Sequence, residues 1–586
     1  MILSLPNELI GKICNEVDRL EDKKNLQRTC SRLGRALRPH VLSEVSLNIH
    51  KHNLKPGLNL LHALVHQKEV YSPHIRTLYI DSLSPTFFPN PEFARKQELA
   101  KHTWELFEMV RGWVSDPIDD RNPEIVKAHT TLKTLLDPAL RTLHNLETVH
   151  WHWHWKDSEW TLQTIMESLS SLNGIKSFSF SSTPHVSRPA EVWHNPFTQL
   201  PNFSNLHVLS ISILTEGNTN ASLRNSAPAI ILPLMTHLLS RTTSLSHLHL
   251  DTGISSSSCP SFPFDDISQA SNTTLLSSIT HLSIGGWSID ILPDIPIHFP
   301  NLTSLSVRIG RRSGHGLKWL FDSLSFNDIR LRSIVFDKFT EDMLDYISSY
   351  SGIETLSFIG PNWYSERPEY GFTAERFYGE ILGLHRDSLV KLEVLPTFEG
   401  EWCFGEDNLE AIGRCEKLRY LGVRLRSAGI YVDPNFDLWF FEQLTNESTP
   451  NLVYTLLDMI NTNLPHLQSL HIDSPHFGDS STRSGTKYCR GVRKGIRKSL
   501  EAVCDPCIEE NAVRRGVLRW VKVYVAGERF EFESMGSSDN SCAAAIAIER
   551  DQARRGGGRG GGSLKRKSIG SRLKAITARM SWRLTG

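Results

Sequence analysis

The sequence lacks the features that identify most membrane proteins and secreted disulfide-rich domains. It has no run of about 18 apolar residues that would cross a bilayer, and the best candidate, residues 227–239, contains Pro233 and His237. Its nine cysteines are an odd number without framework spacing, which favours reduced thiols inside a cell. Residues 1–8 hold no basic stretch ahead of an apolar run, so we expect no secretory signal. These absences predict a soluble cytoplasmic or nuclear protein.

Catalytic and cofactor motifs are also missing. The patterns Gly-x-Ser-x-Gly, Gly-x-Gly-x-x-Gly and Gly-Lys-Ser/Thr do not occur. One Cys-x-x-Cys, Cys504 to Cys507, has only Cys489 nearby, and packing explains it more simply than zinc or redox chemistry. Lys plus Arg and Asp plus Glu both number 64, so the whole chain shows no preference for nucleic acid. We therefore predict no enzyme, no cofactor, no metal and no nucleic-acid partner.

What the sequence does contain is one short phrase, apolar-x-x-apolar-x-apolar, which returns about twelve times. Its second half alternates apolar and polar residues, the period of a strand with one buried face. Each copy therefore predicts one strand. The apolar triplets are Ile75-Leu78-Ile80, Leu146-Val149-Trp151, Ile175-Phe178-Phe180, Leu206-Leu209-Ile211, Leu245-Leu248-Leu250, Ile279-Leu282-Ile284, Leu302-Leu305-Val307, Leu331-Ile334-Phe336, Ile353-Leu356-Phe358, Leu389-Leu392-Val394, Leu418-Leu421-Val423 and Leu467-Leu470-Ile472.

Helical periodicity separates these strands. It occurs at residues 160–172, 230–239, 316–324, 341–350, 374–384 and 451–464. A strand followed by a helix cannot bury its apolar side alone, so neighbours must stack with a parallel sheet on one side of an arc and helices on the other. The uneven spacing of the copies predicts an irregular α/β solenoid. An ordinary doubly wound sheet is disfavoured because twelve copies share one phase and no phosphate loop is present.

The phrase resembles the leucine-rich repeat over about four hundred residues, although the Asn that usually follows the strand in that family is missing from nearly every copy. We expect a solenoid at residues 43–475, with a helical insertion at about 82–141. A C-terminal cap is expected at residues 476–533, with helices near 490–503 and 506–515 and a hairpin of 517–525 and 529–533.

Residues 3–42 resemble an F-box. The motif opens with Leu5-Pro6-x-Glu8-Leu9, where Pro6 suits a first helical turn and Glu8 lies near the positive end of the helix dipole. Two short helices, about 22–28 and 31–37, complete a three-helix unit that stops at Pro39.

In that family, the opening Leu-Pro and the following apolar residues dock onto the Skp adaptor of a cullin-RING ubiquitin ligase. The resemblance implies that adaptor contacts come from Leu5, Pro6, Leu9, Ile10, Ile13, Leu26 and Leu33, with departures from the pattern at Lys23, Lys24 and Thr29. The order of an F-box, a strand at 45–49 and repeats is similar to that of fungal F-box receptors with leucine-rich repeats. A helical cap over the first repeat is the alternative, because solenoids need capped ends.

The register of the repeat also predicts an exposed polar face. Val149, Trp151 and Trp153 should point into the core, and His150, His152 and His154 should project from the open face. The same register exposes His247, His249, His281 and His471, beside Ser177, Ser179, Ser210, Ser283, Ser304, Ser306, Ser333 and Ser357. A flat strand offers no convergent metal pocket. We therefore predict that an unknown protein target binds at His150, His152, His247, His249 and His281; a solvated face without a ligand is the alternative.

The C-terminal tail, residues 534–586, has a composition typical of disorder. From Glu549 onward, eleven basic and two acidic residues give about +9. Ile569, Leu573, Ile576 and Met580 recur at helical spacing among basic residues, so contact with an acidic membrane, a partner groove or an import receptor stays open. Taken together, the residues predict a non-catalytic substrate receptor of a ubiquitin ligase; a repeat scaffold without ligase association is the alternative.

Overall fold

The structure of this chain is a computed structural model, and residues 1–548 form one compact unit. It describes residues 9–12, 17, 20–87, 122–154, 156–183, 203, 205–213, 244–252, 277–287, 295–308, 315–360, 369–427, 430, 451–475, 483–504, 511–532 and 546–548. The predicted helix at 230–239 and the basic tail from Glu549 onward lie outside these residues.

One sheet of 16 strands runs through this unit, and its spatial order is the order of the sequence. Strands β1 to β14 pair in parallel, whereas β14–β15 and β15–β16 pair antiparallel. All twelve predicted strands are confirmed. The strands are β1 (Glu44–Leu47), β2 (Thr77–Ile80), β3 (Thr148–His154), β4 (Ser177–Thr183), β5 (Val208–Ile213), β6 (His247–Asp251), β7 (His281–Gly285), β8 (Ser304–Arg308), β9 (Ser333–Phe336), β10 (Thr355–Gly360), β11 (Lys391–Pro396), β12 (Tyr420–Arg424), β13 (Ser469–Asp473), β14 (Lys522–Val525), β15 (Glu528–Phe532) and β16 (Ile546–Ile548).

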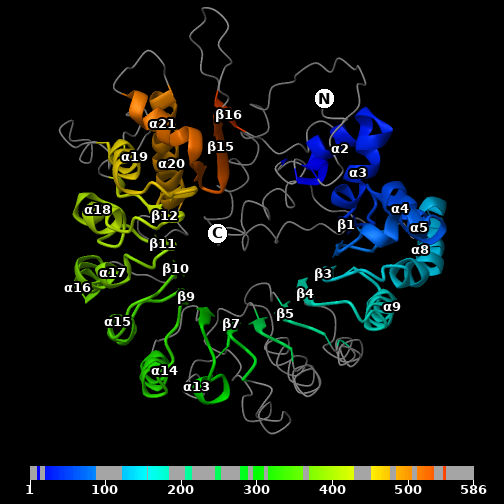
Figure 1. Cartoon of the computed structure of the whole chain (residues 1–586), viewed down its shortest axis with the longest axis horizontal. Coiled ribbons are helices and arrows are strands. Elements are labelled where there is room, and N and C mark those ends of the chain that lie inside the picture. Colours follow the sequence, from blue (N-terminus) through cyan, green and yellow to red (C-terminus); the bar gives the residue numbers. More distant parts are fainter. Residues whose placement is uncertain are drawn as a thin grey trace, which may run out of the picture. The chain divides into compact units, whose positions relative to one another are not determined.

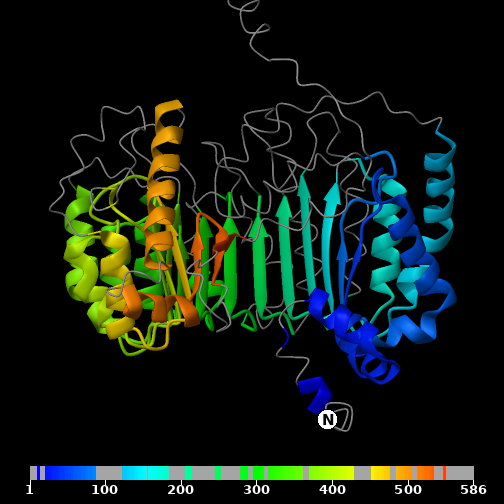
Figure 2. The ribbon, with the colours of Figure 1, turned by 90° about the horizontal axis from the view of Figure 1, so that it is seen from above.

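Helices lie along one face of the parallel sheet, on the outside of its curve (Figure 1), and Figure 2 shows the strands running side by side. The opposite face, here called the inner face, lies on the inside of the curve in Figure 1. The helical elements are α2 (Leu20–Thr29), α3 (Ser31–Val41), α4 (Leu54–His66), α5 (Lys68–Tyr71), η2 (Ser72–His74), α8 (Pro123–Arg141), α9 (Glu159–Ser170), α13 (Ile295–His298), α14 (His315–Phe326), α15 (Glu341–Ser348), α16 (Glu369–Arg376), the π-helical η8 (Phe377–Ile381), α17 (Leu382–His385), α18 (Glu406–Gly413), α19 (Leu452–Asn463), α20 (Arg483–Cys504) and α21 (Ala512–Trp520).

The apolar positions of the phrase form the core. Each of them pairs with its counterpart on the next strand, as Leu78 does with Val149 and Val149 with Phe178. These side chains are fully buried and belong to one continuous apolar core that extends from Leu47 to Val525. Because each repeat buries its apolar side only against its neighbours, the array is stable as a whole rather than repeat by repeat.

Polar side chains link the successive turns that precede the strands. Asn145, Asn205 and Asn301 each stand one residue before the first apolar position of a phrase, and each donates to a carbonyl of the preceding turn at 2.8–3.0 Å. Ser244 and Ser278 occupy the same place and donate at 2.9 and 2.6 Å. These bonds join each turn to the preceding one at the N-terminal side of the strands. They also satisfy backbone carbonyls that would be costly to leave unpaired.

The N-terminal helices pack as a small module of their own. Ile10, Leu37 and Val41 form an apolar cluster apart from the main core, with Leu26 and Leu33 packed against it. The prediction that the third helix stops at Pro39 was wrong, because α3 continues to Val41 and ends where the Leu42 amide donates to the Arg38 carbonyl. Proline so close to the end removes one helical hydrogen bond without preventing the last turn.

The cap and the insertion also needed correction. Val517 begins no strand but lies in α21, and β14 starts five residues later at Lys522. Ile546–Ile548 forms β16 within the stretch that we expected to be disordered, because its two isoleucines alternate as a short strand requires. The insertion contributes one described helix, α8, while residues 82–87 are not helical. No helix within the described ranges is long and apolar enough to cross a bilayer.

Candidate protein-binding surface

The parallel register places polar side chains in rows across the inner face. His150 lies beside Ser179 and Ser179 beside Ser210, and the row continues through His249 to Ser283. Each of these residues alternates with a buried one along its strand. Here the inner face of β3 to β8 is called the Ser/His surface; its members are His150, His152, Ser179, Ser181, Ser210, Ser212, His247, His249, His281, Ser283, Ser304 and Ser306.

Hydrogen bonds between strands fix the imidazole rings on this surface. His249 is held between two serines, with Nε2 3.3 Å from Ser212 Oγ and Nδ1 2.6 Å from Ser283 Oγ. His152 Nδ1 lies 2.8 Å from Ser181 Oγ. Because a serine hydroxyl both donates and accepts, either ring tautomer is accommodated. The surface is thus pre-ordered while its hydroxyls keep capacity for a further bond.

Two of the histidines stack on each other. The rings of His247 and His281 lie 3.9 Å apart at 12° between planes, and each Nδ1 is 2.9 Å from the hydroxyl of the preceding residue, Ser246 or Thr280. Tyr79 stacks on His150 in the same way at 4.9 Å. Close stacking of His247 on His281 disfavours protonation of both rings together, because two cations at this distance would repel each other.

Burial lowers the pKa of the five predicted target-binding histidines below the ordinary value of 6.5. Carboxylates oppose the shift at three of them: Glu44 at His150, Asp81 at His152 and Asp251 at His249. All five side chains are partly buried, so the structure places them on one face of the sheet as predicted, in a neutral state near pH 7. Their role in binding a target remains a prediction.

His154 was wrongly assigned to the exposed row. It lies at the end of β3 against Phe87, with ring centroids 3.8 Å apart, and only 6% of it is exposed. Asp157 fixes this corner by accepting from the amides of Leu83 at 2.8 Å and His154 at 3.0 Å and from the Ser82 hydroxyl at 3.2 Å. Burial raises the pKa of Asp157 to about 7 and lowers the pKa of His154 to about 3. The chain after β2 covers this histidine, which the repeat phase alone could not reveal.

A second region of the inner face has a different chemistry. The charged–aromatic region comprises the inner-face residues Lys391, Glu393, Tyr420, Arg424, His471, Asp473 and Tyr524 of β11 to β14. Glu393 accepts from the hydroxyls of Ser357 at 2.7 Å and Tyr420 at 3.0 Å and pairs with Lys391 at 3.1 Å. Burial raises the pKa of Glu393, but Lys391 and the hydrogen bonds outweigh it and hold the pKa below its usual value.

The mostly buried carboxylate of Asp473 anchors the far end of this region. It pairs with Arg424 at 3.5 Å and Arg493 at 3.0 Å and accepts from the Ser474 amide at 2.8 Å. Burial works against ionisation, but the two guanidinium groups hold the pKa of Asp473 below its usual value. Sequence reasoning missed this network, although Lys391 and Glu393 stand at polar positions of the phrase and Asp473 directly follows a copy of it, so that the alternation of the strand could have located all three.

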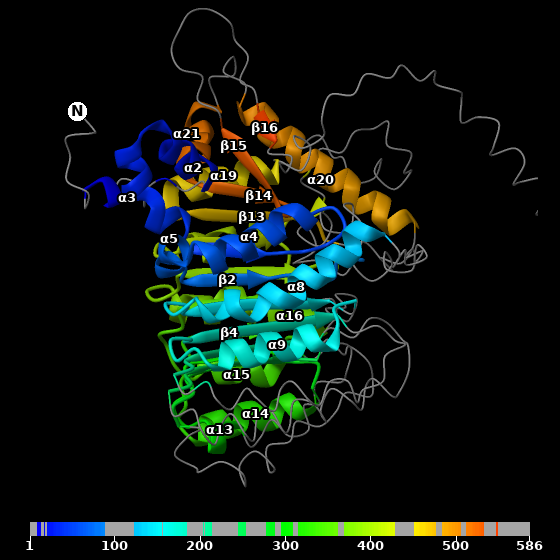
Figure 3. The ribbon, with the colours of Figure 1, turned by 90° about the vertical axis from the view of Figure 1, so that its right-hand side faces the viewer.

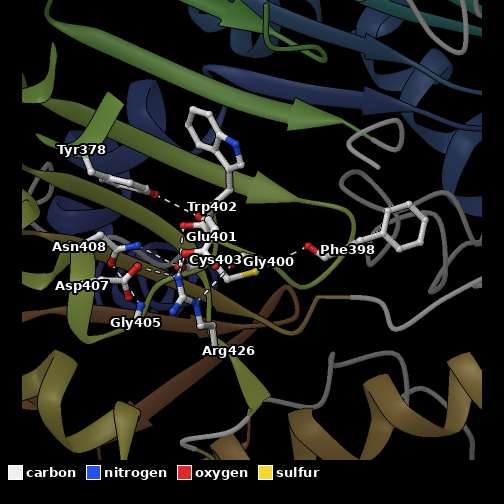
Figure 4. A network of polar contacts seen from close by, with 10 residues as sticks. All are labelled: Tyr378, Phe398, Gly400, Glu401, Trp402, Cys403, Gly405, Asp407, Asn408 and Arg426. Atoms are coloured by element: carbon white, nitrogen blue, oxygen red, sulfur yellow. Dashed lines mark hydrogen bonds and ion pairs between the residues drawn. The ribbon is translucent and has the colours of Figure 1, made fainter. Parts of the chain in front are cut away.

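The loop after β11 is fastened by its own polar groups (Figure 4). Arg426 donates to Asp407 at 2.7 Å and to Glu401 at 3.0 Å. Tyr378 donates to the Trp402 carbonyl at 3.0 Å and Asn408 to the Cys403 carbonyl at 2.8 Å. These groups bind one another, so the network reads as a structural brace at the end of β11 rather than as a ligand site.

The predicted adaptor residues of the N-terminal module differ in their exposure to solvent. Leu9 is 44% exposed, whereas Ile10 is 1% exposed and belongs to the module's own core. Leu26 and Leu33 are half-buried against that core. Leu5, Pro6 and Ile13 lie outside the described residues. Of the seven, Leu9 is therefore the one whose described position leaves a large apolar surface open.

The described parts of the chain hold no group of three or more His, Cys, Asp or Glu side chains that could bind a metal ion. Burial raises the pKa of the Cys403 and Cys504 thiols to about 12, which leaves little thiolate near pH 7. Cys507 lies outside the described residues.

Comparisons with known proteins add little. No family model matches the chain, and no curated protein matches it. Among solved structures, the chain is similar to one described as the crystal structure of the Rad7 and Elc1 complex in yeast, with 13% identity and a TM-score of 0.29. That match covers 82% of this chain and 90% of the other. A similarity of this extent assigns neither family nor function.

Proposed function

We propose that this protein is a non-catalytic, cytoplasmic or nuclear substrate-recognition subunit of an SCF-type ubiquitin ligase. In this role the N-terminal module binds a Skp-type adaptor and the inner face of the sheet binds a protein target. The receptor raises the effective concentration of a target lysine near the conjugating enzyme and performs no chemistry itself. Its partners are the adaptor, the cullin-RING ligase and an unidentified protein.

The proposal depends on one combination of features. A separately packed helical cluster, with Leu9 open, precedes a long sheet whose inner face carries pre-ordered neutral hydroxyls and imidazoles. Neutral hydrogen-bonding groups suit recognition of a protein surface, because bonds left unmade with a wrong partner are costly. The F-box resemblance of residues 3–42 supports the ligase assignment of the module.

A pull-down of a Skp-type adaptor by the intact chain tests the proposal. Leu9→Asp should abolish capture, since an unpaired charge in a dry interface costs several kcal/mol. The matched control is Lys55→Asp on the exposed side of α4, which should bind normally. Ile10→Asp reports on disruption of the module itself, because it places a charge in the buried cluster.

Deleting residues 1–42 provides the complementary measurement. Mass spectrometry of captured proteins should lose the adaptor and cullin but keep the target, provided that the repeats stay folded by circular dichroism. If the intact chain captures target proteins and no adaptor, the protein is a repeat scaffold without ligase association, and the proposal fails.

A further inference from the structure

Three large apolar side chains are exposed together on the outer helices. Ile297 of α13 is 66% exposed, and Trp319 and Phe326 of α14 are 63% and 90% exposed. Trp319 and Phe326 are seven residues apart, which places them two turns apart on one side of α14. Here the three residues are called the outer apolar patch. Figure 3 shows α13 and α14 adjoining each other.

The core does not need these three residues. α14 already buries Leu317, Leu320 and Leu324 against the sheet, each with no measurable exposure. Exposed apolar residues that occur singly are ordinary, but clustered aromatic side chains mark interaction sites, and tryptophan is prominent among binding hot spots. The outer apolar patch therefore points to a partner.

Acidic groups border the patch on the side of α15. A hollow of about 260 Å³ between α14 and α15 is lined in part by Asp322, Asp342 and Asp345. Lys318 also lines the hollow, and Asp345 pairs with Arg376 at 2.7 Å. Asp322, in the middle of α14, lies between the exposed aromatic residues along the helix and also faces the hollow. The apolar side chains and Asp322 thus lie on α14, and Asp342 and Asp345 on α15 extend the acidic border beside them.

From these features we propose that α13 to α15 dock a basic amphipathic helix of a partner protein. The spacing of Trp319 and Phe326 matches two turns of a helix, so apolar partner residues at i, i+3 or i+4 and i+7 can pack between them and Ile297. Lysine or arginine on the adjoining side of that helix then faces Asp322 and Asp342. This charge complementarity determines both the sign of the charge on the partner helix and the orientation in which that helix binds.

This surface is distinct from the target surface of the proposed function. The outer apolar patch lies on the helices, whereas the Ser/His surface lies on the opposite face of the same sheet. A target and a basic helix can therefore be held at the same time. Variants of the two surfaces should act independently, so failure of one assignment leaves the other standing.

Fluorescence anisotropy of labelled synthetic helices with the intact protein tests this inference. The probes are a 20-residue leucine–lysine amphipathic peptide and its leucine–glutamate counterpart. The wild type should bind the lysine peptide saturably and the glutamate peptide at least about tenfold more weakly. Trp319→Ala combined with Phe326→Ala should weaken lysine-peptide binding at least about tenfold. Asp322→Lys should weaken the lysine peptide and strengthen the glutamate peptide.

Trp520→Ala, at an exposed tryptophan of α21, is the matched control and should bind as the wild type does. His247→Glu on the inner face should also leave peptide binding unchanged. Equal affinity for both peptides, no saturable binding, or full binding by the Trp319 and Phe326 double variant would overturn the inference. So would sedimentation of the wild type as a dimer that the double variant dissociates, because a second copy of the chain would then occupy the patch.

Discussion

Two regions of the inner face share the same parallel strand pairing but differ in how their polar side chains are bonded. On the Ser/His surface, neutral imidazoles are spaced by hydroxyls that keep free hydrogen-bonding capacity. In the charged–aromatic region, the carboxylates of Glu393 and Asp473 are largely buried and already bonded to cations and hydroxyls of the surrounding strands and of α20. The first arrangement is suited to binding, and the second stabilises the contact between repeats. A polar row on a sheet therefore indicates binding only where its groups keep hydrogen-bonding capacity beyond the bonds that they make to one another.

The largest effect should come from Asp473→Ala in the charged–aromatic region. Removing this carboxylate leaves Arg424 and Arg493 without their shared acceptor in a site where Arg424 is only 9% exposed. Leaving a buried charge uncompensated costs about 3 to 5 kcal/mol. Urea unfolding should show this as an earlier transition.

The matched control is Asp387→Ala, because Asp387 pairs with Arg386 at 3.7 Å but is 90% exposed. It should change stability by no more than about 0.5 kcal/mol. Equal losses in the two variants would contradict the structural role assigned to the Asp473 cluster.

A smaller loss is expected for Glu393→Gln. The amide keeps the shape but cannot accept from both Ser357 and Tyr420 while neutralising Lys391, and hydrogen bonds to a charged group contribute about 1.5 to 3 kcal/mol. The folded-state pKa of Glu393 lies below its usual 4.5, so its contribution is present above about pH 4.5 and is lost as pH falls further. The difference between wild type and variant should therefore shrink in acid; a difference that grows would exclude this assignment.

The sequence predicted the strands well and the surface only in part. Repeat phase located Leu78, Val149 and their counterparts, because burial of one strand face is a period-two property that any single chain displays. It could not show that Phe87 covers His154, since that contact joins segments 67 residues apart. The saturation of Glu393 by three strands likewise depends on register between repeats of unequal length. The sequence could therefore assign each polar residue to a face of the sheet, but it could not show which of these residues bond to other residues of the chain.

Acid titration should destabilise the Ser/His surface and the charged–aromatic region over different pH ranges. Burial lowers the folded pKa of His249 below its unfolded value of 6.5, so the unfolded chain binds more protons and stability falls as pH drops below about 6.5. Asp473, whose folded pKa lies below 3.8, keeps its contribution until pH falls below about 4. Each fully shifted group changes stability by at most about 1.4 kcal/mol per pH unit.

Hydrogen exchange from pH 7 to pH 4.5 provides the measurement. Amides of β6 and β7 should lose protection first, while those of β12 and β13 keep it. Asp157 acts with the opposite sign, because its folded pKa is raised to about 7 and its contribution fades as pH rises, so β3 is left out of the comparison. Simultaneous loss in both regions would mean that the histidines carry no separate acid sensitivity.

The smallest effect on stability, and the sharpest one on binding, should come from His247→Glu combined with His281→Glu. These rings are partly exposed and contact each other, unlike the deeper His249, so their replacement should cost no more than about 0.5 kcal/mol each. The change places two negative charges where the wild-type surface is neutral, and a target selected for neutral donors and acceptors should then be repelled. Target capture should fall while adaptor capture stays intact.

Lys522→Glu, at the exposed start of β14 in the same row of the sheet, is the control and should leave capture unchanged. Normal capture by the double variant would instead assign recognition to the long loops at residues 82–90 or 252–272, and the Ser/His surface would then be a solvated sheet face.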